Sequence, residues 1–123
     1  MMKAYILALA LFASTSAFAR QYFQCSSMDM NSSDVMVVNL ATKDGGTLMV
    51  SPGAEYDERV VVKIKFDKVE DNKHVFKIVD ETNSGSVAIP SEVVGKSVNS
   101  VNVDLAFGNY QFTFSCFARI YND

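Results

Sequence analysis

Apolar and polar residues alternate along most of the chain after residue 20. The clearest case spans residues 100–117, where the pair Gly108-Asn109 separates two alternating runs. A period of two places every second side chain on one face of a strand, and Gly-Asn between such runs is typical of a two-residue hairpin turn. The pattern predicts a hairpin that pairs Phe107 with Tyr110 and Val101 with Cys116, with the apolar side chains on one face.

A second alternating pair covers residues 60–67 and 74–78, with Asp71-Asn72 near the turn. A two-residue turn would set Phe66 opposite Lys77 and mix the apolar and polar faces. A three-residue loop over 71–73 would instead pair Phe66 with Ile78. The pattern therefore predicts the three-residue loop.

Weaker alternation predicts further strands at 34–41, 47–51 and 85–89, and Pro90 could open a single helical turn that Gly95 ends. Short strands with turn signals at this spacing predict an all-β fold. We expect one antiparallel domain of about seven to eight strands, built as a small barrel or a sandwich.

The first 19 residues have the organisation of a secretory signal peptide. A short basic start is followed by the apolar run 5–13 and by Ala17-Phe18-Ala19, which matches a signal-peptidase site. The apolar run is too short for a membrane-spanning helix. The sequence therefore predicts a signal peptide at 1–19 and an exported domain at 20–123, periplasmic or secreted, whose mature form does not span the membrane.

Two cysteines, Cys25 and Cys116, are present in the chain. In an oxidising compartment two cysteines allow one pairing, so a Cys25–Cys116 disulfide is expected. Closing so long a loop stabilises a fold by about 4–5 kcal/mol through the unfolded chain. A bond between the first and last strands favours a closed barrel.

The mature chain carries ten Lys or Arg (eleven less Lys3) against fourteen Asp or Glu, a formal charge of −4. Nucleic acids and anionic membrane surfaces favour basic proteins, so neither is an expected partner.

Catalysis has few candidate groups. His74 is the only histidine, and the hairpin register above places it opposite Glu70, which suggests an ordinary surface contact. Both cysteines are expected to be oxidised, so no nucleophile–base pair is evident. The acids of 55–58 lack the spacing of a calcium loop, and the methionines of 28–36 are expected to pack under a loop or to fill gaps in the core. We expect no enzyme activity, no cofactor and no metal.

Two features could serve binding. The loop 51–58 combines a Pro-Gly turn with acids and a tyrosine, and its candidate contact residues are Ser51, Gly53, Glu55 and Tyr56. Apolar side chains are also expected on the outer faces of strands, where they could form a contact patch; these are Val35, Val37, Val61, Val75, Val79 and Phe117.

The segments Phe23-Gln24-Cys25 and Ser51-Pro52-Gly53-Ala54-Glu55-Tyr56 resemble corresponding segments of the periplasmic inhibitors of c-type lysozyme. The resemblance implies a small disulfide-linked β-barrel whose loop enters the lysozyme cleft, with Ser51 and Tyr56 in that loop. The negative net charge of the chain would suit a basic lysozyme.

The expected function is therefore non-enzymatic binding of a protein or a cell-envelope component, with inhibition of a lysozyme-like hydrolase as one form of it. The alternative is a lipocalin-like carrier of a small apolar ligand. Bulky side chains such as Phe66, Phe76 and Phe112 should fill so small an interior, which disfavours the carrier. A solvent-connected apolar cavity would favour it.

Overall fold

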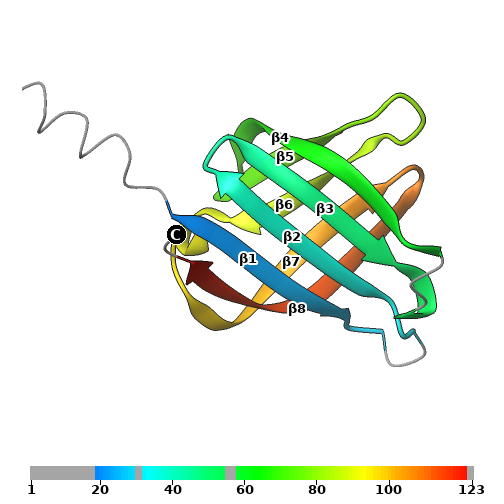
Figure 1. Cartoon of the computed structure of the whole chain (residues 1–123), viewed down its shortest axis with the longest axis horizontal. Helices are drawn as coiled ribbons and strands as arrows, with labels where there is room; N and C mark the ends of the chain where they lie inside the picture. The colour runs from blue at the N-terminus through cyan, green and yellow to red at the C-terminus, as the bar shows by residue number, and fades with distance from the viewer. Residues whose placement is uncertain (1–18, 30–31, 55–57, 122–123) are drawn as a thin grey trace, which may run out of the picture.

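The computed structural model describes residues 19–29, 32–54 and 58–121, and these form one closed eight-stranded barrel (Figure 1). Each strand pairs antiparallel with the next one in the sequence, and the last pairs with the first. The strands are β1 (Arg20–Ser27), β2 (Val35–Thr42), β3 (Gly45–Ser51), β4 (Val60–Glu70), β5 (Lys73–Val79), β6 (Gly85–Pro90), β7 (Val98–Phe107) and β8 (Tyr110–Tyr121). Of the two architectures that the sequence left open, the barrel is the one adopted.

The interior of the barrel is filled by the inward-facing side chains of all eight strands. Alternation along each strand sends every second residue inward, so the core is built from the apolar positions of the sequence pattern. The most deeply buried apolar side chains are Phe23, Met36, Val38, Leu40, Leu48, Phe76, Val87, Ile89, Val103, Phe114 and Ala118.

The C-terminal hairpin has the predicted register. Phe107 pairs with Tyr110 and Val101 with Cys116 across the turn Gly108-Asn109. The disulfide Cys25–Cys116 is also confirmed: the two cysteines are directly opposite on β1 and β8, and each is 3% exposed. The bond therefore lies inside the seam where the barrel closes.

The prediction of a three-residue loop at 71–73 is wrong. Asp71 and Asn72 form a two-residue turn with φ of 53° and 62°, and Glu70 pairs directly with Lys73. A bulge at Asp67 absorbs the offset of one residue, so the apolar side chains of the two strands still share a face.

The register of this hairpin changes the surroundings of two side chains. Phe66 is opposite Phe76 rather than Ile78, and His74 is opposite Val69 rather than Glu70.

The β2–β3 turn is shorter than the sequence suggests, because Gly45 and Gly46 belong to β3. A Cβ atom on Gly46 would lie 1.8 Å from the carbonyl oxygen of Asn39, and one on Gly45 would lie 2.3 Å from that of Ile64. The two glycines therefore allow neighbouring backbones to approach closely where the strand begins.

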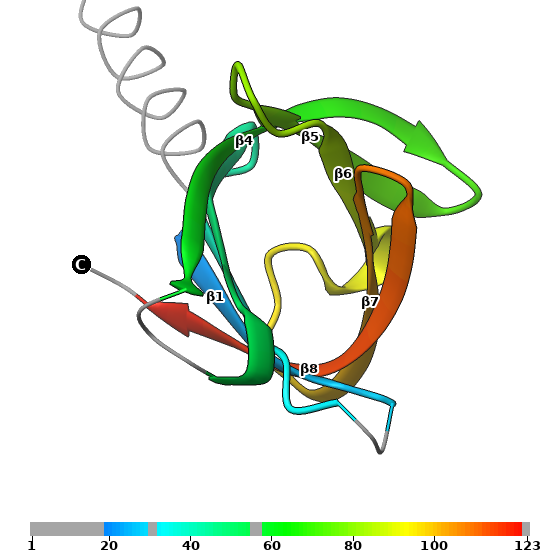
Figure 2. The ribbon, with the colours of Figure 1, turned by 90° about the vertical axis from the view of Figure 1, so that its right-hand side faces the viewer.

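The two ends of the barrel differ. At one end the loop 91–97, which begins with the 3₁₀ turn η3 (Ser91–Val93), crosses the interior; Figure 2 shows it in yellow behind the ring of strands. We call this the closed end. The opposite end, which faces the viewer in Figure 2, carries the turns at 80–84 and 108–109 and the 3₁₀ turn η1 (Pro52–Ala54). We call this the open end.

Candidate binding site at the open end of the barrel

A cavity of about 220 Å³ opens at the open end of the barrel. One wall comes from the β7–β8 hairpin and the other from the start of β2, the end of β3, η1 and the start of β4. The lining residues are Leu105, Phe107, Tyr110, Phe112 and Phe114 on the hairpin side, and Asp34, Val50, Pro52 and Val60 on the other. Apart from Asp34, the wall is apolar or aromatic.

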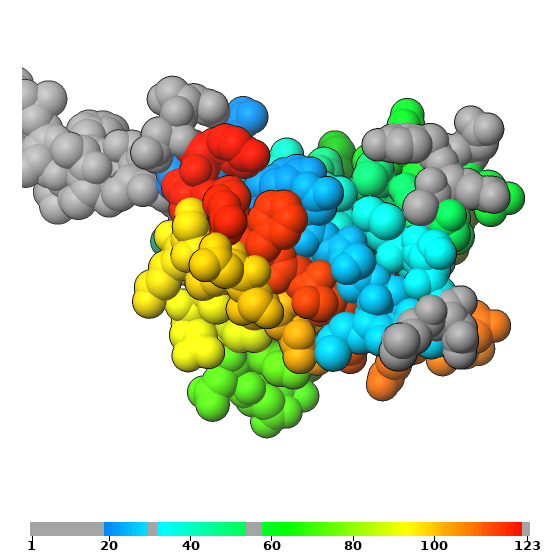
Figure 3. Space-filling view, turned by 90° about the horizontal axis from the view of Figure 1, so that it is seen from below, coloured from blue at the N-terminus to red at the C-terminus, as the bar shows by residue number. Residues whose placement is uncertain are grey.

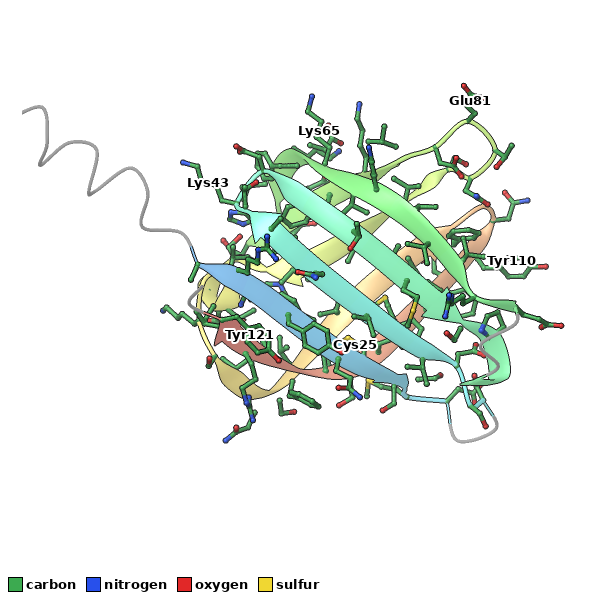
Figure 4. All side chains as sticks on the ribbon, viewed as in Figure 1. Cys25, Lys43, Lys65, Glu81, Tyr110 and Tyr121 are labelled. Atoms are coloured by element: carbon green, nitrogen blue, oxygen red, sulfur yellow. A yellow bond between two sulfur atoms is a disulfide. The ribbon has the colours of Figure 1, made fainter. Side chains whose placement is uncertain are left out.

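The hairpin wall is a ladder of aromatic rings. Tyr110, Phe112 and Phe114 follow one another at a spacing of two residues, so their side chains share the inner face of β8. The Tyr110 and Phe112 rings stack with centroids 6.1 Å apart, and those of Phe112 and Phe114 are 6.5 Å apart. Their exposed fractions fall from 69% through 38% to 1%. The ladder therefore runs from the rim, where Figure 4 shows Tyr110 projecting outward, to the buried core.

The opposite wall is held by Asp34. Its Oδ1 atom accepts a hydrogen bond from the backbone N–H of Gly53 at 2.8 Å, and its carbonyl oxygen accepts one from the N–H of Ser27 at 3.0 Å. Gly53 has a φ of 61°, a left-handed conformation that glycine adopts without strain. Asp34 thus joins the η1 turn to the start of β2.

The residues expected to contact a partner have different positions. Ser51 is the last residue of β3, pairs with Val35 and is 4% exposed. Gly53 lies exposed on η1, next to Pro52 of the cavity lining. Glu55 and Tyr56 lie outside the described residues. The role of these four residues in binding stays a prediction.

The closed end of the barrel is covered by the loop 91–97, which one side chain holds in place. Gln21, which is fully buried, donates through Nε2 to the carbonyl oxygens of Val93 and Lys96, both at 2.7 Å, and accepts through Oε1 from the N–H of Gly95 at 2.8 Å. Val93 is 8% exposed and packs into the core. Gln21 therefore holds the loop 91–97 across the barrel.

His74 belongs to the closed end and not to the cavity. Its Nδ1 atom is 2.7 Å from the hydroxyl oxygen of Ser91, and its ring centroid is 5.4 Å from that of Phe66 and 6.4 Å from that of Phe76. The side chain is half-buried, where an ordinary surface position was expected. Its contacts tie β5 to the 91–97 loop.

The loops at the open end are mainly acidic. In the described part of these loops the charged residues are Asp29, Asp34, Glu58, Asp80 and Glu81, against Arg59. The loop 80–84 is joined to the β7–β8 turn by a hydrogen bond from the N–H of Gly108 to the carbonyl oxygen of Ser84 at 3.0 Å. Figure 4 shows Glu81 at the tip of the β5–β6 loop, at the same end of the barrel as Tyr110.

The side-chain amide of Asn83 donates a hydrogen bond to Asp80, which lowers the pKa of that carboxyl group. Asp80 therefore keeps its negative charge to lower pH than an unperturbed aspartate does.

Of the six apolar residues expected on the outer faces of strands, two are exposed, Val61 and Val79, and four are half-buried, Val35, Val37, Val75 and Phe117. Val61 and Val79 on β4 and β5 are 58% and 48% exposed. On another flank, where β8 (red) lies beside β1 (blue) in Figure 3, Phe117 is half-buried. The Arg119 guanidinium lies 5.1 Å from the centre of the Phe117 ring and so covers part of it.

The aromatic wall is the feature that sequence reasoning missed. The bulky residues were expected to fill the interior, and Phe76 and Phe114 do so, with 0% and 1% exposed. Phe107 and Phe112 line an open cavity instead. The sequence does indicate this position, because both residues lie close to the Gly108-Asn109 turn and strand residues close to a turn lie at a barrel rim.

Comparison with protein-family models, with curated proteins and with solved structures gives no match. Within 19–29, 32–54 and 58–121, no helix is long and apolar enough to cross a membrane. Among the same residues, no group of three or more His, Cys, Asp or Glu side chains is placed to hold a metal ion.

Proposed function

We propose that this chain is an exported, non-enzymatic binding protein that holds one small group with a mostly apolar surface in the open end of its barrel. The cavity between the aromatic wall and Val50, Pro52 and Val60 carries this proposal. Such a cavity is the feature expected of a carrier, the alternative raised by the sequence. Concave apolar sites with a few polar groups are the usual form of small-ligand sites.

The volume of the cavity limits the size of the occupant. An apolar cavity of about 150 Å³ accepts benzene, whereas sites for drug-sized ligands measure about 300–1,000 Å³. A cavity of about 220 Å³ lies between these values. It suits a single ring or a short branched chain.

Export is supported by the signal-peptide pattern of residues 1–19 and by the Cys25–Cys116 disulfide, because disulfides persist mainly in oxidising compartments. A non-enzymatic role is supported by the position of His74, which contacts Ser91 at the end of the barrel opposite the cavity.

A titration with 3,3-dimethylbutan-1-ol, a small branched probe, tests the proposal. Binding is followed by the NMR shifts of residues that line the cavity. Val60→Phe places a ring in the cavity and should weaken binding at least about tenfold, because an overfilled site excludes the probe. Val61→Phe is the matched control, since Val61 is 58% exposed on the outer face of the same strand.

Equal binding by both variants would contradict the proposed site. Absence of binding by the unmodified protein would contradict the proposed function.

A second candidate function is recognition of a protein partner through the same end of the barrel. The exposed residues Pro52 and Gly53 of η1 and Tyr110, which is 69% exposed, favour it, because aromatic residues beside turns are frequent interface anchors. The resemblance to inhibitors of c-type lysozyme makes a lysozyme the partner to test.

The test measures lysozyme activity in the presence of the oxidised protein. Tyr56→Ala should weaken inhibition by about 1–2 kcal/mol if the 51–56 loop makes the contact. Val60→Phe should leave inhibition unchanged, since this change lies inside the cavity. If the unmodified protein does not inhibit lysozyme, the proposal that a lysozyme is the partner is contradicted.

A further inference from the structure

We propose that the group held at the open end is a small organic cation, an alkylated ammonium, bound between the rings of Phe107, Tyr110 and Phe112 and the carboxylate of Asp34. This inference rests on the proposed function, because it specifies the ligand of the same cavity.

The first argument is the aromatic wall. An aromatic ring carries negative electrostatic potential on its face, so a cation over the ring is attracted to it. Tyr110 and Phe112 stack side by side at the rim, and Phe107 pairs with Tyr110 across the turn. Clusters of this kind recognise quaternary ammonium groups, whose methyl groups also bury apolar surface.

The second argument is the charge inside the lining. Asp34 is the one acidic or basic residue among the nine residues that line the cavity. Its Oδ1 atom holds the N–H of Gly53, which fixes the carboxylate in place. A carboxylate on an otherwise apolar wall attracts a cation and repels an anion, since the apolar surroundings weaken the screening of its charge.

The third argument is the charge around the rim. The described residues of the open-end loops carry five acidic side chains, Asp29, Asp34, Glu58, Asp80 and Glu81, and one basic side chain, Arg59. Charge of one sign around a concave site raises the local concentration of ligands of the opposite sign. The cavity lining and the rim therefore both favour a positively charged ligand.

Choline and 3,3-dimethylbutan-1-ol test the inference directly. They have nearly the same shape, and only choline is charged. Choline should bind about tenfold more tightly, because cation–π and carboxylate contacts are added to the same apolar burial. This preference should decrease at high salt, because salt screens the acidic rim.

Two variants separate the contribution of the carboxylate from that of the aromatic rings. Asp34→Asn keeps an oxygen for the N–H of Gly53 and removes the charge, so choline should bind about five- to tenfold more weakly while the alcohol is unaffected. Phe112→Leu keeps an apolar wall and removes a ring face, so it should also reduce the preference for choline. Asp71→Asn is the matched control, because it makes the same charge change in a turn at the closed end.

The outcomes distinguish this inference from the proposed function. If the alcohol binds as tightly as choline and Val60→Phe abolishes its binding, the apolar site stands and the cation inference is overturned. A preference for choline that survives both Asp34→Asn and Phe112→Leu also overturns it. If neither probe binds to the unmodified protein, both proposals are overturned.

Discussion

The side-chain oxygen of Gln21 accepts a hydrogen bond at 2.8 Å from the backbone N–H of Gly95, a residue 74 positions later in the chain. The amide nitrogen of the same side chain donates to two further backbone carbonyls of the 91–97 loop. One glutamine thus replaces the hydrogen bonds that a short loop cannot make to itself. The closed end depends on this side chain.

Gln21→Leu should lower the free energy of unfolding by about 2–4 kcal/mol, because it leaves polar backbone groups at the closed end without a partner. Urea denaturation measures the change. Gln24→Leu is the control, because Gln24 is exposed on the outer face of β1, and it should stay within about 0.5 kcal/mol of the unmodified protein. Equal stability of the two variants would show that the loop closes without Gln21.

Replacing Cys116 with alanine should lower the free energy of unfolding by about 2–5 kcal/mol. The disulfide joins residues 91 positions apart, so its loss frees a long loop in the unfolded chain. Denaturation with and without reductant provides the measurement. Reductant should destabilise the unmodified protein and leave Cys25→Ala/Cys116→Ala unchanged. An unmodified protein that unfolds identically in both conditions would contradict the expected contribution.

Asn72→Ala should destabilise the protein by about 1 kcal/mol, because a non-glycine residue with a Cβ is strained in the left-handed region and asparagine tolerates it better than alanine. Asn72 has a φ of 62° in the β4–β5 turn. Asn72→Gly should be neutral or slightly stabilising, since glycine adopts this conformation freely. Thermal unfolding of the pair provides the test, and the opposite order of stabilities would argue against the turn described here.

Lys77→Glu should raise the free energy of unfolding by about 0.5–1 kcal/mol at low salt, because like charges directly opposite on a sheet repel each other. Lys65 and Lys77 are such a pair on the exposed face of β4 and β5. Lys77→Gln should give a smaller gain, since it removes repulsion without adding attraction. The gain should shrink at high salt. A gain that does not depend on salt would indicate another cause.

The strand pattern was readable wherever alternation and turn residues agreed. In the C-terminal hairpin, Gly108-Asn109 fixes the register, and the apolar positions on both sides confirm it. In the β4–β5 hairpin the alternation changes phase at Asp67, and a phase change can be absorbed either in the turn or by a bulge. Nothing in the residue types around Asp67 distinguishes these two solutions, so the sequence alone does not determine the register of this hairpin.

The cavity could not be derived from the pattern, because alternation shows which side chains point inward but not what faces them across the barrel. Phe112 lines open space since the opposite wall presents Val50, Pro52 and Val60 rather than larger side chains.

The contact that holds the closed end, in contrast, has an indication in the sequence. Gln21 occupies an inward position in the series Gln21, Phe23, Cys25, and a polar residue at such a position needs a buried partner.

The strands that close the barrel also determine how the molecule can be attached to a surface. Arg20 pairs with Tyr121, so β1 begins and β8 ends together at the closed end, as Figure 4 shows for Tyr121. The aromatic rim is at the opposite pole. A sensor chip, bead or fluorescent fusion joined beyond Tyr121 therefore leaves the rim facing free solution, whereas coupling through lysines on the flank would present the barrel side-on.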